Sequence, residues 1–154
     1  MSFNLSVIKG EMWVYRIPKE IKVLNELSSF LETETSFYSV TKTADEQSII
    51  VCDEDSSLSG LRKIESKLSS IIRDNPESES EALKIEKDWV AFKVDGVLDF
   101  GLVGILANLS GVLAEAKIPI FVVSTYDTDY ILVKKDRFEE AKSSLINSGC
   151  KISL

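Results

Sequence analysis

The sequence indicates the same order of strands and helices twice, and this repetition limits the chain to few folds. Downstream of residue 84, the hydrophobic periodicity predicts strand, helix, strand, strand, helix and strand in turn. The expected strands are 85–95, 118–124, 129–134 and 150–153, and the expected helices are 101–116 and 136–148. We interpret this order as one βαββαβ unit.

The upstream half shows a similar order. Its expected strands are 5–8, 12–17, 37–40 and 48–52, and its expected helices are 19–31 and 58–72. We therefore predict an α+β fold of two ferredoxin-like βαββαβ units. Each half alone would have a marginal core, so we expect the two units to pack together as a tandem repeat. The expected boundaries are 1–73 for the N-terminal unit, 74–84 for an acidic linker and 85–154 for the C-terminal unit.

Local signals support the ends of the downstream elements. Gly96 follows the strand that contains Trp89 and favours a turn with positive φ. Asp136 and Glu139 have the spacing of a capping box, and Gly149 stands where a left-handed residue would end the last helix. Trp89 itself and Trp13 are expected in the core or between repeats.

The composition excludes several classes of function. The net charge of −7 disfavours binding to duplex nucleic acid, and no apolar run is long enough to span a membrane. The sequence contains no histidine, which removes the commonest general base and metal ligand, and its two cysteines are too far apart to form a ligand set. We expect a cytoplasmic protein that is not an enzyme and has no cofactor, no metal, no nucleic-acid partner and no membrane partner.

Two segments carry a family resemblance. Residues 95–106 and 118–133 resemble the tandem, stand-alone ACT-domain proteins related to the animal cytosolic arginine sensor, and residues 124–133 are the most specific part. Residues 12–18 and 37–51 resemble the first repeat of that sensor more loosely. The resemblance implies a regulatory module that binds a free amino acid, arginine or another, at the interface between the two units. A homo-oligomer or a regulatory partner protein would read the bound state.

The resemblance also implies which residues bind the ligand: Ser48, Ile49, Asp95, Gly96, Val97, Leu98, Asp99, Ser124, Thr125, Tyr126, Asp127, Thr128 and Asp129. Backbone amides after residue 95, near a helix N-terminus, suit a carboxylate. Asp99, Asp127 or Asp129 could receive an ammonium or guanidinium group.

Structural roles for these residues stay open at this point. Asp99 could instead cap the following helix, and Asp127 and Asp129 could shape the hairpin through bonds to its backbone. The alternative function is a constitutive interaction scaffold that has the ACT fold and binds no ligand.

Overall fold

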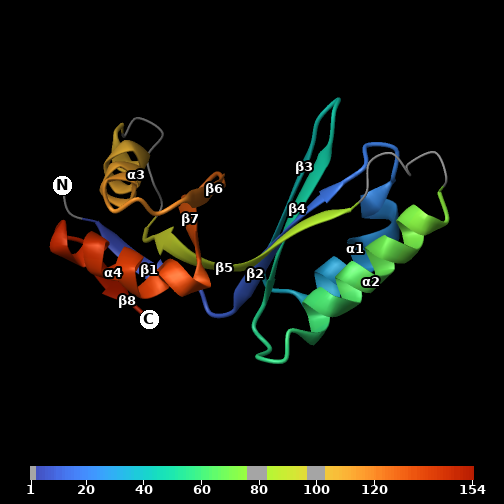
Figure 1. Cartoon of the computed structure of the whole chain (residues 1–154), viewed down its shortest axis with the longest axis horizontal. Helices are drawn as coiled ribbons and strands as arrows, with labels where there is room; N and C mark the ends of the chain where they lie inside the picture. The colour runs from blue at the N-terminus through green and yellow to red at the C-terminus, as the bar shows by residue number, and fades with distance from the viewer. Residues whose placement is uncertain (1–2, 76–82, 97–102) are drawn as a thin grey trace. The chain divides into compact units, whose positions relative to one another are not determined.

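The computed structural model describes residues 3–75, 83–96 and 103–154, and they form two compact units. The first unit is Gly10–Asp88, and the second unit combines Met1–Lys9 with Trp89–Leu154. Strand β5 (Lys84–Val94) begins in the first unit and ends in the second. The mixture of strands and helices confirms the predicted α+β class (Figure 1). Among the described residues, no helix has both the length and the apolar character that crossing a membrane requires.

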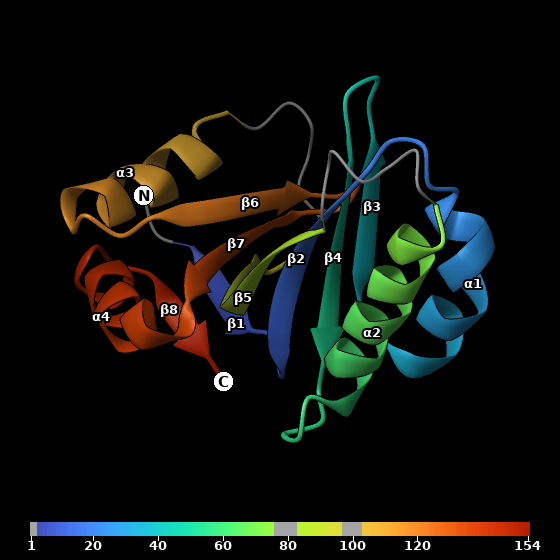
Figure 2. The same cartoon turned by 45° about the vertical axis from the view of Figure 1, so that its right-hand side comes forward.

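The first unit is a sheet with two helices along one face. Its elements are β2 (Glu11–Ile17), α1 (Val23–Glu34), β3 (Tyr38–Lys42), β4 (Gln47–Asp53), α2 (Ser59–Arg73) and the start of β5. Strand β4 lies between β2 and β3 and pairs with both in antiparallel fashion. Helices α1 and α2 lie side by side in both views of the molecule (Figures 1 and 2).

Alternate residues of β2 and β4 form the core of the first unit. Tyr15, Ile49 and Val51 face the helices and are almost fully buried. The Tyr15 hydroxyl donates to the Leu61 carbonyl at 3.1 Å. Burial raises the pKa of Tyr15 far above its usual value, so this hydroxyl stays protonated and joins β2 to α2.

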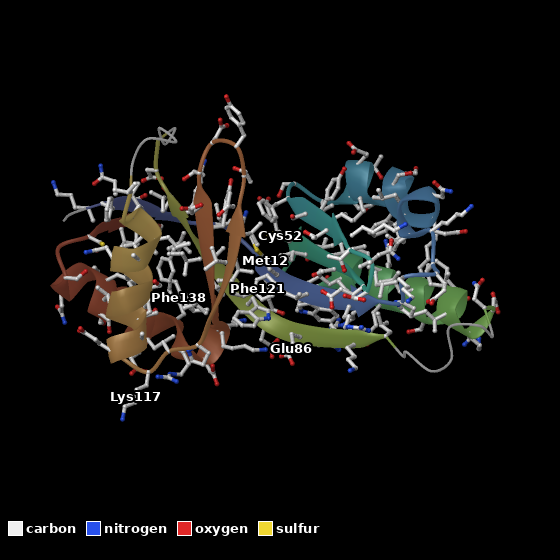
Figure 3. All side chains as sticks on the ribbon, turned by 90° about the horizontal axis from the view of Figure 1, so that it is seen from above. Met12, Cys52, Glu86, Lys117, Phe121 and Phe138 are labelled. Carbon is white, nitrogen blue, oxygen red and sulfur yellow. The ribbon has the colours of Figure 1, made fainter. Side chains whose placement is uncertain are left out.

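The second unit has the same plan with one additional strand. Its elements are β1 (Asn4–Val7), the end of β5, α3 (Ile105–Glu115), β6 (Ile120–Ser124), β7 (Asp129–Lys134), α4 (Phe138–Asn147) and β8 (Lys151–Ser153). The strand order is β6-β7-β5-β1-β8, in which β1 is antiparallel to β5 and parallel to β8. Phe138, labelled in Figure 3, stacks on Phe92 with ring centroids 5.3 Å apart and joins α4 to the sheet.

The position of β1 departs from the predicted boundaries, which placed residues 1–73 in one unit. Leu5 is 1% exposed in the core of the second unit, because β1 fills the space between β5 and β8. The predicted linker falls largely on residues outside those described. Sequence spacing alone could not reveal this pairing, since it joins residues nearly 150 positions apart.

The sequence predicts how the last helix begins and ends, and only the predicted end is confirmed. The capping box at Asp136 is wrong, because a short 3₁₀ turn (Lys135–Arg137) leads into α4 and Arg137 takes the N-cap position without a side-chain cap. The left-handed end at Gly149 is confirmed, with φ of +107°. The amide of Gly149 donates to the Ile146 carbonyl at 2.9 Å, as expected for such an end.

Two glycines provide a matched test of the backbone. Gly10 has φ of +110°, and a Cβ added there would lie 2.5 Å from the Asp53 carbonyl oxygen. Gly10→Ala should therefore destabilise the protein by about 1–3 kcal/mol. Gly111 lies within α3 with open space around it, so Gly111→Ala should stabilise by about 0.5–1 kcal/mol. Chemical denaturation measures both free energies, and equal effects of the two changes would contradict the backbone geometry.

Candidate functional site

A tight turn joins β6 to β7 and lies within residues 124–133, the most specific segment of the family resemblance. Strand β6 ends at Ser124 and β7 begins at Asp129, as the sequence predicts. The Thr125 amide donates to the Thr128 carbonyl at 2.8 Å, and the Thr128 amide donates to the Thr125 hydroxyl at 3.3 Å. Figure 3 shows the connection projecting from the end of the hairpin. The backbone of the turn is thus fixed by its own threonines.

The Thr128 side chain ties this turn to the end of β5. Thr128 is 3% exposed, and its hydroxyl donates to the Val94 carbonyl at 2.6 Å. Val94 directly precedes Asp95 and Gly96, which form the start of the second predicted segment. The structure therefore brings these two parts of the predicted site together.

Asp129 faces the helix-covered side of the sheet. Ile131 and Val133 lie at alternate positions on the same strand and belong to the core of the second unit, so Asp129 shares their face. Its Oδ1 atom accepts a hydrogen bond from the Ser124 hydroxyl at 2.6 Å. The second carboxylate oxygen adds acceptor capacity at a position that is partly exposed.

Asp95 lies toward the opposite face. Its carboxylate accepts a hydrogen bond from the Ser6 hydroxyl, while Leu5 and Val7 on either side of Ser6 pack against the core. Gly96 adopts φ of +84°, which confirms the predicted turn. Asp129 and Asp95 therefore lie toward opposite faces at the same end of the sheet.

A cavity of about 260 Å³ adjoins Asp95. It is lined by Asn4, Leu5, Asp95, Lys151, Ile152 and Ser153. One carboxylate and one ammonium thus line the same space, together with a neutral amide and a hydroxyl. The volume suits a small metabolite, since sites for larger ligands are roughly 300–1,000 Å³. Sequence reasoning missed Asn4 and Lys151, because only the insertion of β1 brings them beside Asp95.

The remaining predicted residues do not all join this arrangement. Tyr126 is 79% exposed and Asp127 is exposed at the tip of the turn. Val97, Leu98 and Asp99 lie outside the described residues. Ser48 and Ile49 lie in β4 of the first unit, where Ile49 is part of the core.

The first unit has its own recess of about 430 Å³, and acidic side chains dominate its lining. The lining residues are Thr33, Glu34, Thr35, Ser36, Cys52, Asp53, Glu54 and Asp55. Asp53 is already engaged, since its carboxylate accepts the amides of Asp55, Gly60 and Leu61 at 2.9–3.2 Å. Burial raises the pKa of Cys52 to about 12, so its thiol stays protonated at neutral pH.

Within the described ranges, no group of three or more His, Cys, Asp or Glu side chains could hold a metal ion.

One family model matches the downstream repeat. Residues 84–147 match the family model of the ACT domain. This stretch begins with β5 and ends with α4, so it contains both Asp95 and the turn before β7. No curated protein sequence matches the chain.

Solved structures extend the likeness to the whole chain. A protein from Agobacterium tumefaciens has a TM-score of 0.69 and 24% identity, with 99% of this chain and 92% of that chain covered. The regulatory subunit of aspartate kinase from Thermus thermophilus has a TM-score of 0.66 and 9% identity, with 93% and 95% covered. Aspartate kinase from Synechocystis has a TM-score of 0.71 and 20% identity, but this chain spans only 28% of it. At these identities the likeness shows a shared ACT-type fold.

The Thr128 hydrogen bond can be tested by an isosteric change. Thr128→Val removes the hydroxyl that donates to Val94, and it should cost about 1–2 kcal/mol of stability because a buried hydrogen bond is lost. Thr41→Val is the matched control, since Thr41 is an exposed threonine in β3. Denaturation should show a loss for Thr128→Val and a near-zero change for Thr41→Val. Equal stabilities would remove Thr128 from the framework of the site.

Proposed function

We propose that this chain is a non-enzymatic regulatory module that binds a free amino acid through its second unit. The site comprises the turn at residues 124–129 and the end of β5. The observation that supports this proposal best is the 2.6 Å hydrogen bond from Thr128 to Val94, which holds an acidic turn against Asp95 and Gly96. A rigid backbone fixes the position of each carboxylate and reduces the entropy lost on binding.

The chemistry at Asp129 suits a cationic group. Its carboxylate accepts hydrogen bonds but donates none, and Ser124 provides only one of the donors that it can accept. An α-ammonium or a guanidinium group supplies further donors and an opposite charge, which gives short charge-assisted hydrogen bonds. Asp129 is therefore the preferred anchor, and the exposed Asp127 is a weaker one.

The choice of an amino acid as ligand draws on the ACT match and on the fold. Similar structures include a regulatory subunit of aspartate kinase that was solved in a ligand-free form. L-Arginine is the first probe, because residues 124–133 resemble the arginine-sensor family most closely. The contribution of Ser48 and Ile49 from the first unit stays a prediction.

A thermal-shift screen of the full chain against the common amino acids tests this function. A ligand at about 100 times its dissociation constant should add roughly 2.7 kcal/mol of stability. We expect a dose-dependent shift with one amino acid or a few chemically related ones. Flat melting curves with every amino acid would contradict the proposal and favour the interaction scaffold.

Three variants locate the site once a stabilising amino acid is found. Asp129→Ala should abolish the shift while leaving the protein folded, because the carboxylate that anchors the cation is gone. Lys151→Met should retain it, since Lys151 lines the cavity beside Asp95 rather than the face of Asp129. Asp45→Ala, in the corresponding turn of the first unit, is the control for a lost exposed acid. Loss of binding in Lys151→Met with retention in Asp129→Ala would move the site to the Asp95 cavity.

A further inference from the structure

Strand β3 forms an open edge of the first unit. Among the described strands it pairs only with β4, and Figure 2 shows it as the outermost strand of that unit. The register joins Tyr38 to Val51 at one end and Lys42 to Gln47 at the other. The far side of the β3 backbone is therefore a template to which another extended chain can add.

Alternate residues of β3 direct their backbone groups away from β4. The Phe37 carbonyl accepts the Cys52 amide at 3.0 Å, and the Thr43 amide donates to the Glu46 carbonyl at 2.9 Å. In an antiparallel pair, residues that bond to the partner strand alternate with residues that do not. The odd-numbered positions thus bond to β4. The even-numbered residues present their amide and carbonyl groups to the open side: Tyr38, Val40 and Lys42.

The residues of this edge do little to prevent the addition of a strand. Natural edge strands are often blocked by proline, by a bulge or by charged side chains. Residues 38–42 contain no proline, and Lys42 at the end is their single charge. The pairing with β4 also runs without a bulge. The backbone at Tyr38 and Val40 is therefore available to an extended segment.

The charge of the first unit favours a basic partner. Residues 10–88 contain 17 acidic and 10 basic side chains, so the whole net charge of −7 lies in this unit. Near the start of β3, Glu32 accepts the Tyr38 hydroxyl, and Glu34 and Glu54 line the recess of the first unit. The described residues that line this recess include neither lysine nor arginine. A Lys or Arg side chain of a partner would meet complementary charge here.

We propose that the β3 edge binds an extended, basic segment of a partner protein, which adds to the sheet of the first unit as a further strand. Its backbone pairs with the outward groups of β3, and its cationic side chains lie near Glu32 and the acidic recess. A second copy of this chain is a poorer occupant, because it would bring two strongly acidic units together. The surface belongs to the first unit and does not depend on the amino-acid site proposed in the second.

A synthetic peptide tests strand addition on the full chain. The probe is fluorescently labelled Arg-Val-Arg-Val-Arg amide, and fluorescence anisotropy measures its binding. The same peptide with every backbone amide N-methylated keeps the charge but cannot donate to the β3 carbonyls. It should bind about tenfold more weakly or worse, as expected when two hydrogen bonds are lost. Glu-Val-Glu-Val-Glu amide should not bind.

Val40→Pro tests whether β3 is the edge involved. The Val40 amide points to the open side, so proline removes an outward donor and leaves the hydrogen bonds to β4 in place. The variant should remain folded in denaturation experiments and bind the basic peptide about tenfold more weakly. Val40→Thr is the matched control, since it retains the amide, and it should bind as the wild type does.

Four results would overturn the proposal. Equal binding of the plain and N-methylated peptides would show attraction by charge alone, and this comparison does not depend on the folding of a variant. Equal binding by the wild type and Val40→Pro would exclude β3. A wild type that does not bind the basic peptide would exclude a basic segment. A wild-type dimer in sedimentation that Val40→Pro dissociates would assign the edge to a second copy.

Discussion

The hydrogen bond from the Thr128 hydroxyl to the Val94 carbonyl holds the turn at residues 124–129 against the end of β5, and the geometry of the candidate site depends on it. It joins a turn that is fixed by its own threonines to the strand that leads into α3. Asp129 follows this turn directly and is therefore held on the helix-covered face of the sheet. Without that bond, the acidic turn would be an ordinary exposed hairpin, and a ligand would have to order it on binding.

The sequence predicts features that depend on neighbouring residues. The turn before Asp129 and the left-handed end at Gly149 are local, since each is determined by side chains within a few positions. The insertion of β1 is different, because it joins Asn4 to Lys151 across almost the whole chain, and hydrophobic periodicity carries no information about such pairing. The same limit concealed the cavity beside Asp95. The capping box failed for another reason, since a 3₁₀ turn makes Arg137 the N-cap residue.

The hairpin turns of the two repeats have matching backbone hydrogen bonds but different side chains. Glutamine can both donate and accept hydrogen bonds, so Gln47 satisfies backbone carbonyls of its own unit. Aspartate only accepts, and Asp129 at the equivalent position receives the Ser124 hydroxyl. The turns differ at a second position as well, since Thr128 donates to the Val94 carbonyl where Glu46 pairs with Arg16 in the first unit.

The most direct test of this account is to follow the backbone amide signals of the isotope-labelled full chain by NMR during titration with the stabilising amino acid. The account predicts that the largest changes occur at residues 124–130 and at Asp95 and Gly96. The matching amides at residues 43–47 should change little, because the Gln47 side chain already donates to two backbone carbonyls of the first unit. Changes at residues 43–47 as large as those at 124–130 would contradict the account.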